Sequence, residues 1–274
     1  MLEIVVCMKQ VPDASEVAID PTTGTLLRAG ADAKTNLYDL YALDLAVTLK
    51  EQYGGRVTVL SMGPPPARSL ITEAYALGAD RGFLLSDRCF AGADTLATAF
   101  TLGQAVRRLP AWDIILTGMQ SSDGDTAQVG PALAEVLGIP HVAYLNKVFA
   151  LVEGQMLVSA DNGDTIDTLQ VQLPALFTCN KQVGQPKLPS FLLKQATKER
   201  PVEVWTAADL AEVVEAEAAA KPGAATTCFG LDGSPTKVEK VFAPELNSRR
   251  ELWAGEPATL AERLYTRLRE LKVV

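Results

Sequence analysis

Apolar runs and helical patterns alternate through the first half of the chain. Four runs have the length and composition of buried strands, and they cover residues 2–7, 56–62, 80–86 and 113–117. Three segments between them repeat apolar residues at helical spacing, over 37–52, 63–78 and 95–109, and a fourth helix is expected to end at Leu137. The order βαβαβαβα predicts an α/β fold, with a doubly wound, mostly parallel sheet and right-handed crossovers.

Polar residues and glycines mark where several of these elements begin and end. Asn36 and Asp94 each precede a helical pattern, which predicts an N-cap at both positions. A Gly-Gly pair at 54–55 predicts the end of the first helix. Residues 16–28 alternate around a turn with Pro and Gly at 20–24, which predicts a hairpin beside the sheet.

The pattern changes after Pro140 to shorter strand-like runs, which we interpret as antiparallel additions to the sheet. These runs are 141–144, 148–153, 156–160, 165–173 and 175–179. Turns are expected at 153–154 and 162–163, and the α/β domain is expected to span residues 1–184.

Apolar residues then cluster among prolines and lysines at 185–200. Exposed apolar loops commonly contact a partner, which makes Leu188, Phe191 and Leu192 candidate contacts. Packing of this segment on its own domain is the alternative.

The C-terminal region, 201–274, is expected to contain helices and an arm that lies on another subunit. Residues 207–220 predict a helix, whereas 221–251 have almost no periodic pattern, which is unusual inside a compact domain. The last helix, 257–271, is amphipathic, and its leucines at helical spacing are Leu260, Leu264, Leu268 and Leu271.

Composition narrows the possible functions. The chain has 274 residues, 48% of them hydrophobic, which is enough for one large core or for one core plus an appendage. Its net charge of −8 argues against nucleic-acid binding, which depends on basic surfaces. The apolar runs are too short to span a membrane and a strand begins the chain in place of a signal peptide, so we expect a cytoplasmic protein without direct membrane insertion.

Cysteine and histidine patterns indicate neither a disulfide framework nor a metal site. The four cysteines are far apart, and we interpret three of them as strand or core residues; they are Cys7, Cys89, Cys179 and Cys228. The single histidine, His141, is interpreted as structural or interfacial.

The loop from Gly118 to Pro131 follows the fourth strand and is the candidate ligand site, because such junctions bind nucleotides in open α/β sheets. Gly118 and Gly124 are expected to form tight or positive-φ turns. Asp125 is the expected N-cap of the next helix, and Thr126 is expected to offer a hydroxyl in its first turn. Backbone N–H groups at a helix start favour phosphate by about 0.3–2 kcal/mol per charge.

Three interpretations of this loop remain open from local sequence. It is a phosphate site in which Asp123 and Asp125 turn inward to accept N–H groups, or an ordinary capped connection, or a cation site that lacks the further ligands of a calcium loop. Neither a Walker loop nor Gly-x-Gly-x-x-Gly is present. Lys9 lies at the same expected sheet edge, where it either approaches phosphate or is a solvated loop lysine.

Several motifs together resemble the β subunit of electron transfer flavoproteins, over nearly the whole chain. In order they are Ile4-Val-Val-Cys-Met-Lys-Gln-Val-Pro-Asp13, Asn36 with Tyr38-Asp39, Val57-Thr-Val-Leu-Ser-Met-Gly-Pro-Pro65, Leu77-Gly-Ala-Asp80, the Asp123–Pro131 loop and Gly233-Ser-Pro-Thr-Lys-Val238. Members of this family are heterodimers whose α subunit carries one FAD, whereas the β subunit holds AMP or, in electron-bifurcating members, a second FAD. The resemblance implies an adenine-nucleotide α-hydrolase-like fold and places 201–274 against the α subunit.

The resemblance also implies specific contacts. Those to the nucleotide are Cys7, Lys9, Asn36, Leu37, Tyr38, Asp39, Met62, Gly118, Asp123, Gly124, Asp125, Thr126, Ala127, Gln128, Val129, Gly130, Pro131, Ala132, Leu133 and Ala134. Phe191 aligns with a leucine that anchors a partner dehydrogenase. No catalytic acid or base is implied on this chain, because redox chemistry belongs to the bound flavin.

The loop pattern implies FAD in preference to AMP. The sequence Asp-Gly-Asp-Thr-Ala-Gln-Val-Gly-Pro at 123–131 is that of bifurcating members, whereas AMP-holding members read Asp-Asp-Asp-x-Asn-Gln-Thr-Gly-Gln. NADH is then the implied hydride donor. The implied acceptors are the α-subunit FAD with an acyl-CoA or hydroxy-acid dehydrogenase, and ferredoxin or flavodoxin.

Two positions depart from this pattern. Met119 replaces a basic residue found in many members, which implies a different potential for the second flavin, and Leu37 replaces a proline. The alternatives are an AMP-binding β subunit that shuttles single electrons, and a stand-alone ATP-binding signalling domain.

Overall fold

The computed structural model describes residues 1–13, 18–19, 26–27, 33–220, 229–239 and 250–273. The chain divides into two compact units, Met1–Lys240 and Val241–Val274, which are treated separately below. No helix within the described ranges is both long and apolar enough to cross a lipid bilayer.

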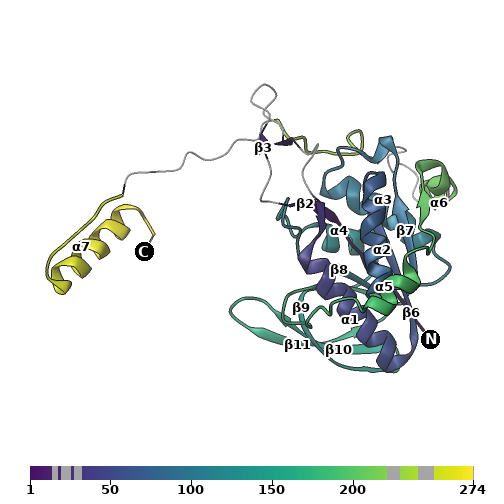
Figure 1. Ribbon diagram of the computed structural model, residues 1–274, viewed down its shortest axis with the longest axis horizontal. Coiled ribbons are helices and arrows are strands. Elements are labelled where there is room, and N and C mark those ends of the chain that lie inside the picture. The colour runs from purple at the N-terminus through teal and green to yellow at the C-terminus, as the bar shows by residue number, and fades with distance from the viewer. Residues whose placement is uncertain (14–17, 20–25, 28–32, 221–228, 240–249, 274) are drawn as a thin grey trace. The chain divides into compact units, whose positions relative to one another are not determined.

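Nine strands of the first unit form one sheet (Figure 1) in the order β11-β10-β9-β12-β8-β1-β6-β7-β13. In that order their bounds are Ile166–Gln172, Gln155–Asp161, His141–Val152, Ala175–Cys179, Ile114–Gly118, Leu2–Cys7, Gly55–Met62, Arg81–Leu85 and Glu203–Trp205. The seven neighbouring strands β9-β12-β8-β1-β6-β7-β13 pair in parallel, whereas β10 pairs antiparallel with both β9 and β11. The predicted mostly parallel sheet is confirmed.

Helices cover both faces of the sheet, as its alternating strand residues require. In β1, Ile4 and Val6 point into one core, and Val5 and Cys7 point into the other. Helices α1 (Leu37–Tyr53) and α2 (Arg68–Ala76) pack in the first core, and α3 (Thr95–Arg108), α4 (Val129–Leu137) and α6 (Ala207–Ala220) pack on the second. The doubly wound architecture is therefore confirmed.

Local sequence signals located the elements of the first half closely. Helix α1 begins after Asn36 and ends before Gly54, as predicted. The Asp94 carboxylate accepts hydrogen bonds of 3.0 Å from the backbone N–H groups of Leu96 and Ala97, which confirms the predicted N-cap of α3.

The second half differs from its prediction in three strands. The runs predicted at 141–144 and 148–153 form one strand, β9, which has irregular register against β10. Strand β12 is not an antiparallel addition, because it lies between β8 and β9 and is parallel to both. All five of its residues are buried, which suits a central parallel strand. Strand β13 was not predicted at all.

Smaller elements flank the sheet. Strand β2 (Gln10–Pro12) pairs antiparallel with β5 (Ala33–Thr35). The predicted hairpin is seen as an antiparallel pair of β3 (Ala18–Ile19) and β4 (Leu26–Leu27), whereas its turn at 20–24 lies outside the described residues. The predicted loop at 185–200 contains a helix, α5 (Phe191–Thr197), because Ser190 caps it by accepting a 3.0 Å hydrogen bond from the backbone of Leu193.

The cysteines divide between core and surface. Cys7 and Cys179 are buried strand residues, as predicted, whereas Cys89 is exposed in a short 3-10 helix. Cys228 lies outside the described residues. Of the three cysteines expected in strands or the core, two are found there among the described residues.

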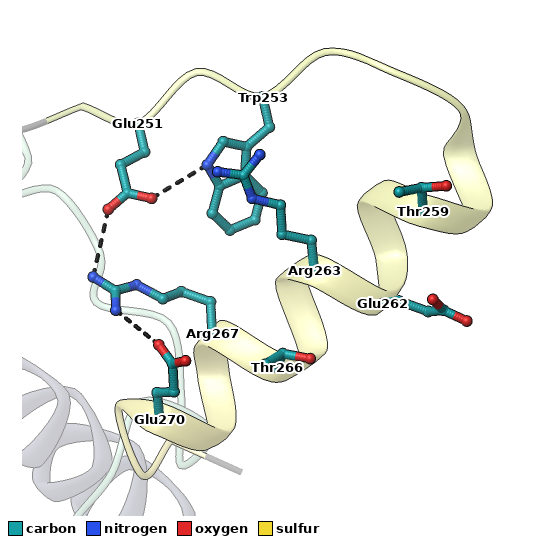
Figure 2. A pocket seen from close by; sticks show the side chains of 8 residues that line it. All are labelled: Glu251, Trp253, Thr259, Glu262, Arg263, Thr266, Arg267 and Glu270. Atoms are coloured by element: carbon teal, nitrogen blue, oxygen red, sulfur yellow. Dashed lines mark hydrogen bonds and ion pairs between the residues drawn. The ribbon is translucent and has the colours of Figure 1, made fainter.

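The second unit contains α7 (Pro257–Glu270), which agrees with the predicted amphipathic helix. Figure 2 shows its charged face, where a depression of about 550 Å³ is lined by Glu251, Trp253, Thr259, Glu262, Arg263, Thr266, Arg267 and Glu270. Arg267 bridges Glu251 at 3.4 Å and Glu270 at 2.9 Å, and the Arg263 guanidinium stacks 4.5 Å from the Trp253 ring. Because this face is internally paired, we do not regard the depression as a ligand site.

Candidate functional site

The candidate site lies where the chain reverses its direction of travel across the sheet. From β1 the chain adds β6 and β7 on one side, whereas β8 and then β12 lie on the other side. Ligands of open α/β sheets bind beyond the carboxyl ends of the strands at such a switch point. Here the segments leaving β1 and β8 meet, and they carry Lys9 and the loop 119–128.

An ion pair joins these two segments. The Lys9 ammonium lies 2.7 Å and 2.8 Å from the two carboxylate oxygens of Asp123, and 3.5 Å from the hydroxyl of Ser121. The side chain of Lys9 is 47% exposed and that of Asp123 is 15% exposed. Lys9 therefore lies at the predicted ligand edge, with one side of its ammonium held by the loop.

The charge of Asp123 depends on this partner. Burial raises the pKa of the Asp123 carboxyl, but the hydrogen bond and the positive charge of Lys9 outweigh burial and hold the pKa below its ordinary value. Asp123 is thus ionised at neutral pH. Its carboxylate accepts hydrogen bonds from the Lys9 ammonium, whereas the phosphate interpretation of the loop had it turn inward to accept loop and helix N–H groups.

Asp39 lies beneath the same junction in the first turn of α1. Its carboxylate accepts hydrogen bonds from the backbone of Lys9 at 2.7 Å, from the Asn36 amide at 2.9 Å and from the backbone of Gly118 at 3.1 Å. Burial raises the pKa of Asp39 to about 7, although these hydrogen bonds and the charge of Lys9 lower it. Asp39 therefore connects the ends of β1 and β8.

The loop glycines follow their prediction only in part. Gly118 and Gly124 do not have positive φ; the positive-φ residues of the loop are Asp125 at 52° and Ala127 at 54°. Gly118 is required by close approach, because a Cβ there would lie 2.3 Å from Oδ1 of Asp39. At Gly124 the nearest atom to a Cβ would be the Ser121 hydroxyl at 3.5 Å, which is ordinary contact. Of the predicted tight or positive-φ turns, Gly124 lies in a turn at 122–124, whereas Gly118 ends β8 and the positive φ angles fall on Asp125 and Ala127.

The start of α4 also differs from its prediction. The helix begins at Val129, so Asp125 is not its N-cap and Thr126 lies before its first turn. The carboxylate of Asp125 accepts from the Gln120 amide. The residue at the N-cap is Gln128, whose side chain makes no capping hydrogen bond and accepts 3.0 Å from the Thr95 hydroxyl. No side chain at the N-cap therefore competes with an anion for the first N–H groups of α4.

Burial sorts the other residues assigned to the nucleotide. Leu37 is 56% exposed, and Tyr38, Met62, Pro131 and Ala132 are partly exposed near the edge. Cys7, Gly130, Leu133 and Ala134 are buried, so their side chains serve packing. A Cβ at Gly130 would lie 2.5 Å from the Thr178 methyl group, which shows that α4 packs closely on β12.

The start of α3 is a neighbour of this site that the local sequence did not indicate. Asp94, already the N-cap of α3, also accepts from the backbone of Thr236 at 3.0 Å and from its hydroxyl at 2.7 Å. The Ser234 hydroxyl accepts from the backbone of Asp94 at 2.8 Å. The Gly-Ser-Pro-Thr motif is therefore held against the helix whose Thr95 contacts Gln128. The capping signal located Asp94, but nothing in the local sequence linked it to residue 236.

The candidate partner contacts are strongly exposed. Leu188 is 93% exposed, and Phe191 and Leu192 are each 79% exposed. Leu188 lies just before α5, and Phe191 and Leu192 are in its first turn, so this segment presents three apolar side chains to solvent, as a contact surface would.

Comparisons with known proteins agree with the resemblance noted above. A family model described as the electron transfer flavoprotein domain matches residues 23–210. The chain is 43% identical over 252 residues to the electron transfer flavoprotein subunit beta of Clostridium acetobutylicum, covering 92% of each chain. It is 36% identical to subunit CarD of the caffeyl-CoA reductase-Etf complex of Acetobacterium woodii, covering 100% of each chain. It is 40% identical to the protein FixA of Azorhizobium caulinodans, covering 91% of this chain and 87% of that protein.

Proposed function

This chain belongs to the electron transfer flavoprotein family as a β subunit, and from this premise we propose that it binds FAD at the edge between Lys9 and the loop 119–128. The observation that carries the proposal is the meeting of Lys9 and Asp123 at the switch point between β1 and β8. There, the Lys9 ammonium contacts the loop that leads into α4, a helix whose start has no side-chain cap, and an ammonium and free backbone N–H groups are donors that suit phosphate.

The donor set and the space around the loop are compatible with a dinucleotide. We propose that the first turn of α4 offers backbone N–H groups to the phosphates and that Lys9, at the same sheet edge, supplies the positive charge. Gly124 and Ala127 are small, and a Cβ at Gly124 would meet nothing closer than 3.5 Å. The exposed Leu37 and the partly exposed Tyr38 and Met62 are proposed to line the rest of the site.

The chain's own residues then bind, orient and shield a cofactor, and none of them acts as a catalytic acid or base. Bound FAD supplies hydride acceptance and single-electron release. We propose that NADH is the donor and that the electrons divide between the α-subunit FAD with its dehydrogenase and ferredoxin or flavodoxin. The loop sequence at 123–131 supports this proposal. The similarity to a subunit of a caffeyl-CoA reductase-Etf complex is compatible with an acyl-CoA or hydroxy-acid dehydrogenase as partner.

We further propose that the protein acts in the cytoplasm and that separate parts of the chain contact the dehydrogenase and the α subunit. Leu188, Phe191 and Leu192 would contact the dehydrogenase through their exposed side chains. Within 201–274, β13 is an edge strand of the sheet of the first unit and α6 packs on that sheet, so α7 is the element proposed to rest on the α subunit. The unburied leucines of α7 support this assignment.

An AMP-binding β subunit that shuttles single electrons is the second candidate. Met119, beside Gln120 in the loop, brings no positive charge to the second phosphate of a dinucleotide. AMP has one phosphate group, so it needs fewer hydrogen-bond donors and positive charges at this edge than FAD does.

Extraction of nucleotides from the purified heterodimer separates these candidates. We expect two FAD molecules and no AMP for each heterodimer. One FAD and one AMP would instead establish the shuttling form.

A further inference from the structure

We propose that Asn36 and Asp39 form a buried clasp that sets the position of the loop 119–128, and that they act on nucleotide binding through this loop and not by touching the ligand. This inference rests on the proposed nucleotide site. It concerns how the site is built, whichever nucleotide occupies it.

The first half of the clasp is Asp39. Its side chain accepts three hydrogen bonds, and two of them come from the backbone at the ends of β1 and β8, at Lys9 and Gly118. The residue is only 5% exposed. Because both oxygens are engaged from inside the protein, the carboxylate connects the two strand ends and does not face a ligand.

The second half of the clasp is Asn36. Its amide nitrogen donates to Asp39 at 2.9 Å and to the carbonyl of Gln120 at 2.9 Å, and its amide oxygen accepts from the backbone of Ser122 at 3.3 Å. Its own backbone N–H donates to the carbonyl of Lys9 at 2.9 Å. Asn36 is 1% exposed. The residue occupies the N-cap position of α1, but its side chain binds the loop and does not cap the helix.

The two residues together hold the ligand edge at four backbone positions, 9, 118, 120 and 122. These positions flank the Lys9–Asp123 ion pair and lead directly into the start of α4. Gly118 shows how closely the clasp fits, since a Cβ there would lie 2.3 Å from Oδ1 and 2.9 Å from the backbone nitrogen of Asp39. A shift of the clasp therefore moves the loop that carries the proposed phosphate donors.

The clasp depends on the protonation state of Asp39. A carboxylate can accept from all three donors, whereas a carboxylic acid directs its own proton toward one of them. The groups that face Asp39 are the Lys9 ammonium and the thiols of Cys7 and Cys179. Burial raises the pKa of Cys7 to about 12 and that of Cys179 further, so both thiols are neutral near pH 7. Asp39 is therefore the group of the clasp that changes its protonation state near pH 7.

The test compares Asp39→Asn with the wild-type heterodimer, using FAD and AMP as probes. Asparagine removes a negative charge but places an NH₂ group where N–H donors point, so we expect nucleotide affinity at pH 8 to fall at least 10-fold. If Asp39 were only an unfavourable charge near phosphate, affinity would rise instead. Asp44→Asn, on the same helix but turned toward Lys187, is the matched control and should bind nucleotide as the wild type does.

The pH profile gives a second readout. If only the ionised clasp is competent, wild-type affinity falls about 10-fold between pH 8 and pH 6, given a pKa of about 7. Asp39→Asn should not show this 10-fold fall. The phosphate of the ligand titrates equally in both experiments, so subtracting one pH profile from the other cancels its contribution. Equal pH dependence in both proteins would overturn the proposal.

A third measurement needs no ligand. Hydrogen exchange at the backbone N–H groups of Lys9, Gly118 and Ser122, which donate to the clasp, should accelerate in the nucleotide-free protein. We expect this in Asp39→Asn and in Asn36→Ala, with helices α2 and α3 unchanged. Accelerated exchange with no nucleotide bound by the wild type would reject the proposed function and leave the clasp intact. Weakened binding with unchanged exchange would show that Asp39 touches the ligand, which rejects the clasp alone.

Discussion

The ammonium of Lys9 lies 2.7 Å from Oδ1 of Asp123, although the two residues are 114 positions apart. This pair joins the ends of β1 and β8 at the edge proposed to bind nucleotide. Its lysine remains 47% exposed, so the charge is accessible to an anion from solvent.

Lys9→Gln should therefore weaken nucleotide binding by about 10-fold at low salt, because a cation is lost and the Asp123 carboxylate is left unpaired beside phosphate. The effect should shrink as ionic strength rises. Titration of the heterodimer at two salt concentrations measures both. Lys50→Gln breaks a comparable pair with Asp80, at 2.8 Å, away from this edge and serves as the control. Equal affinity of wild type and Lys9→Gln at low salt would exclude Lys9 from the site.

The stability of the protein should carry a signature of Asp39. The unfolded side chain releases its proton near 3.8, whereas the folded carboxyl has its pKa raised to about 7. The folded state thus binds the proton more tightly over this interval, and the contribution of Asp39 to stability is largest below pH 4 and declines as pH rises toward 7. Urea unfolding of wild type and Asp39→Asn from pH 4 to 8 checks the sign. A wild-type advantage that grew with pH in this range would contradict it.

Asp94→Ala should destabilise the first unit by about 1–2 kcal/mol, because it removes the N-cap of α3. It also removes the acceptor that holds Thr236, so the Gly-Ser-Pro-Thr segment should be cleaved faster by trypsin after Lys237. Asp94→Asn retains an oxygen acceptor and should be intermediate. Unfolding midpoints and proteolysis rates measure the two effects separately, and unchanged cleavage would mean that other contacts hold the segment.

Phe191→Ala should weaken the dehydrogenase partner's affinity by about 10- to 150-fold, since burial of such a side chain contributes roughly 1.5–3 kcal/mol. Flavin content should stay normal. Ile166→Ala, at a side chain of similar exposure on β11, is the control, and the measurement is the concentration of heterodimer that half-saturates electron transfer. If every candidate dehydrogenase responds equally to wild type and variant, α5 is not the docking element.

NADH should reduce the heterodimer directly and should reduce ferredoxin only when the dehydrogenase and its oxidised substrate are present. The loop sequence at 123–131 motivates this expectation. The assay follows both acceptors, and bifurcation requires equal numbers of electrons in each. Failure of NADH to bleach either flavin would favour the AMP-binding form, and Met119 would be the first position to restore to a basic residue.

Local sequence determined the elements whose signals lie within a few residues of one another. The apolar run of β1, the start of α1 after Asn36, the cap at Asp94 and the period of α1 each depend on neighbours along the chain, and all were located from pattern alone. The alternating order of strands and helices also determined the doubly wound class, and with it the edge where Lys9 and the loop after β8 would meet.

Tertiary structure decided what depends on residues distant in sequence. The insertion of β12 beside β8 was decided by the pairing of Ala175 with Ile114, which no local period encodes. The need for glycine at 118 comes from a carboxylate 79 positions away, and the late start of α4 from a loop whose turns are made by Asp125 and Ala127. Asn36 carries a local capping signal, yet its side chain is taken by a distant loop, because a buried amide is best satisfied where three partners converge.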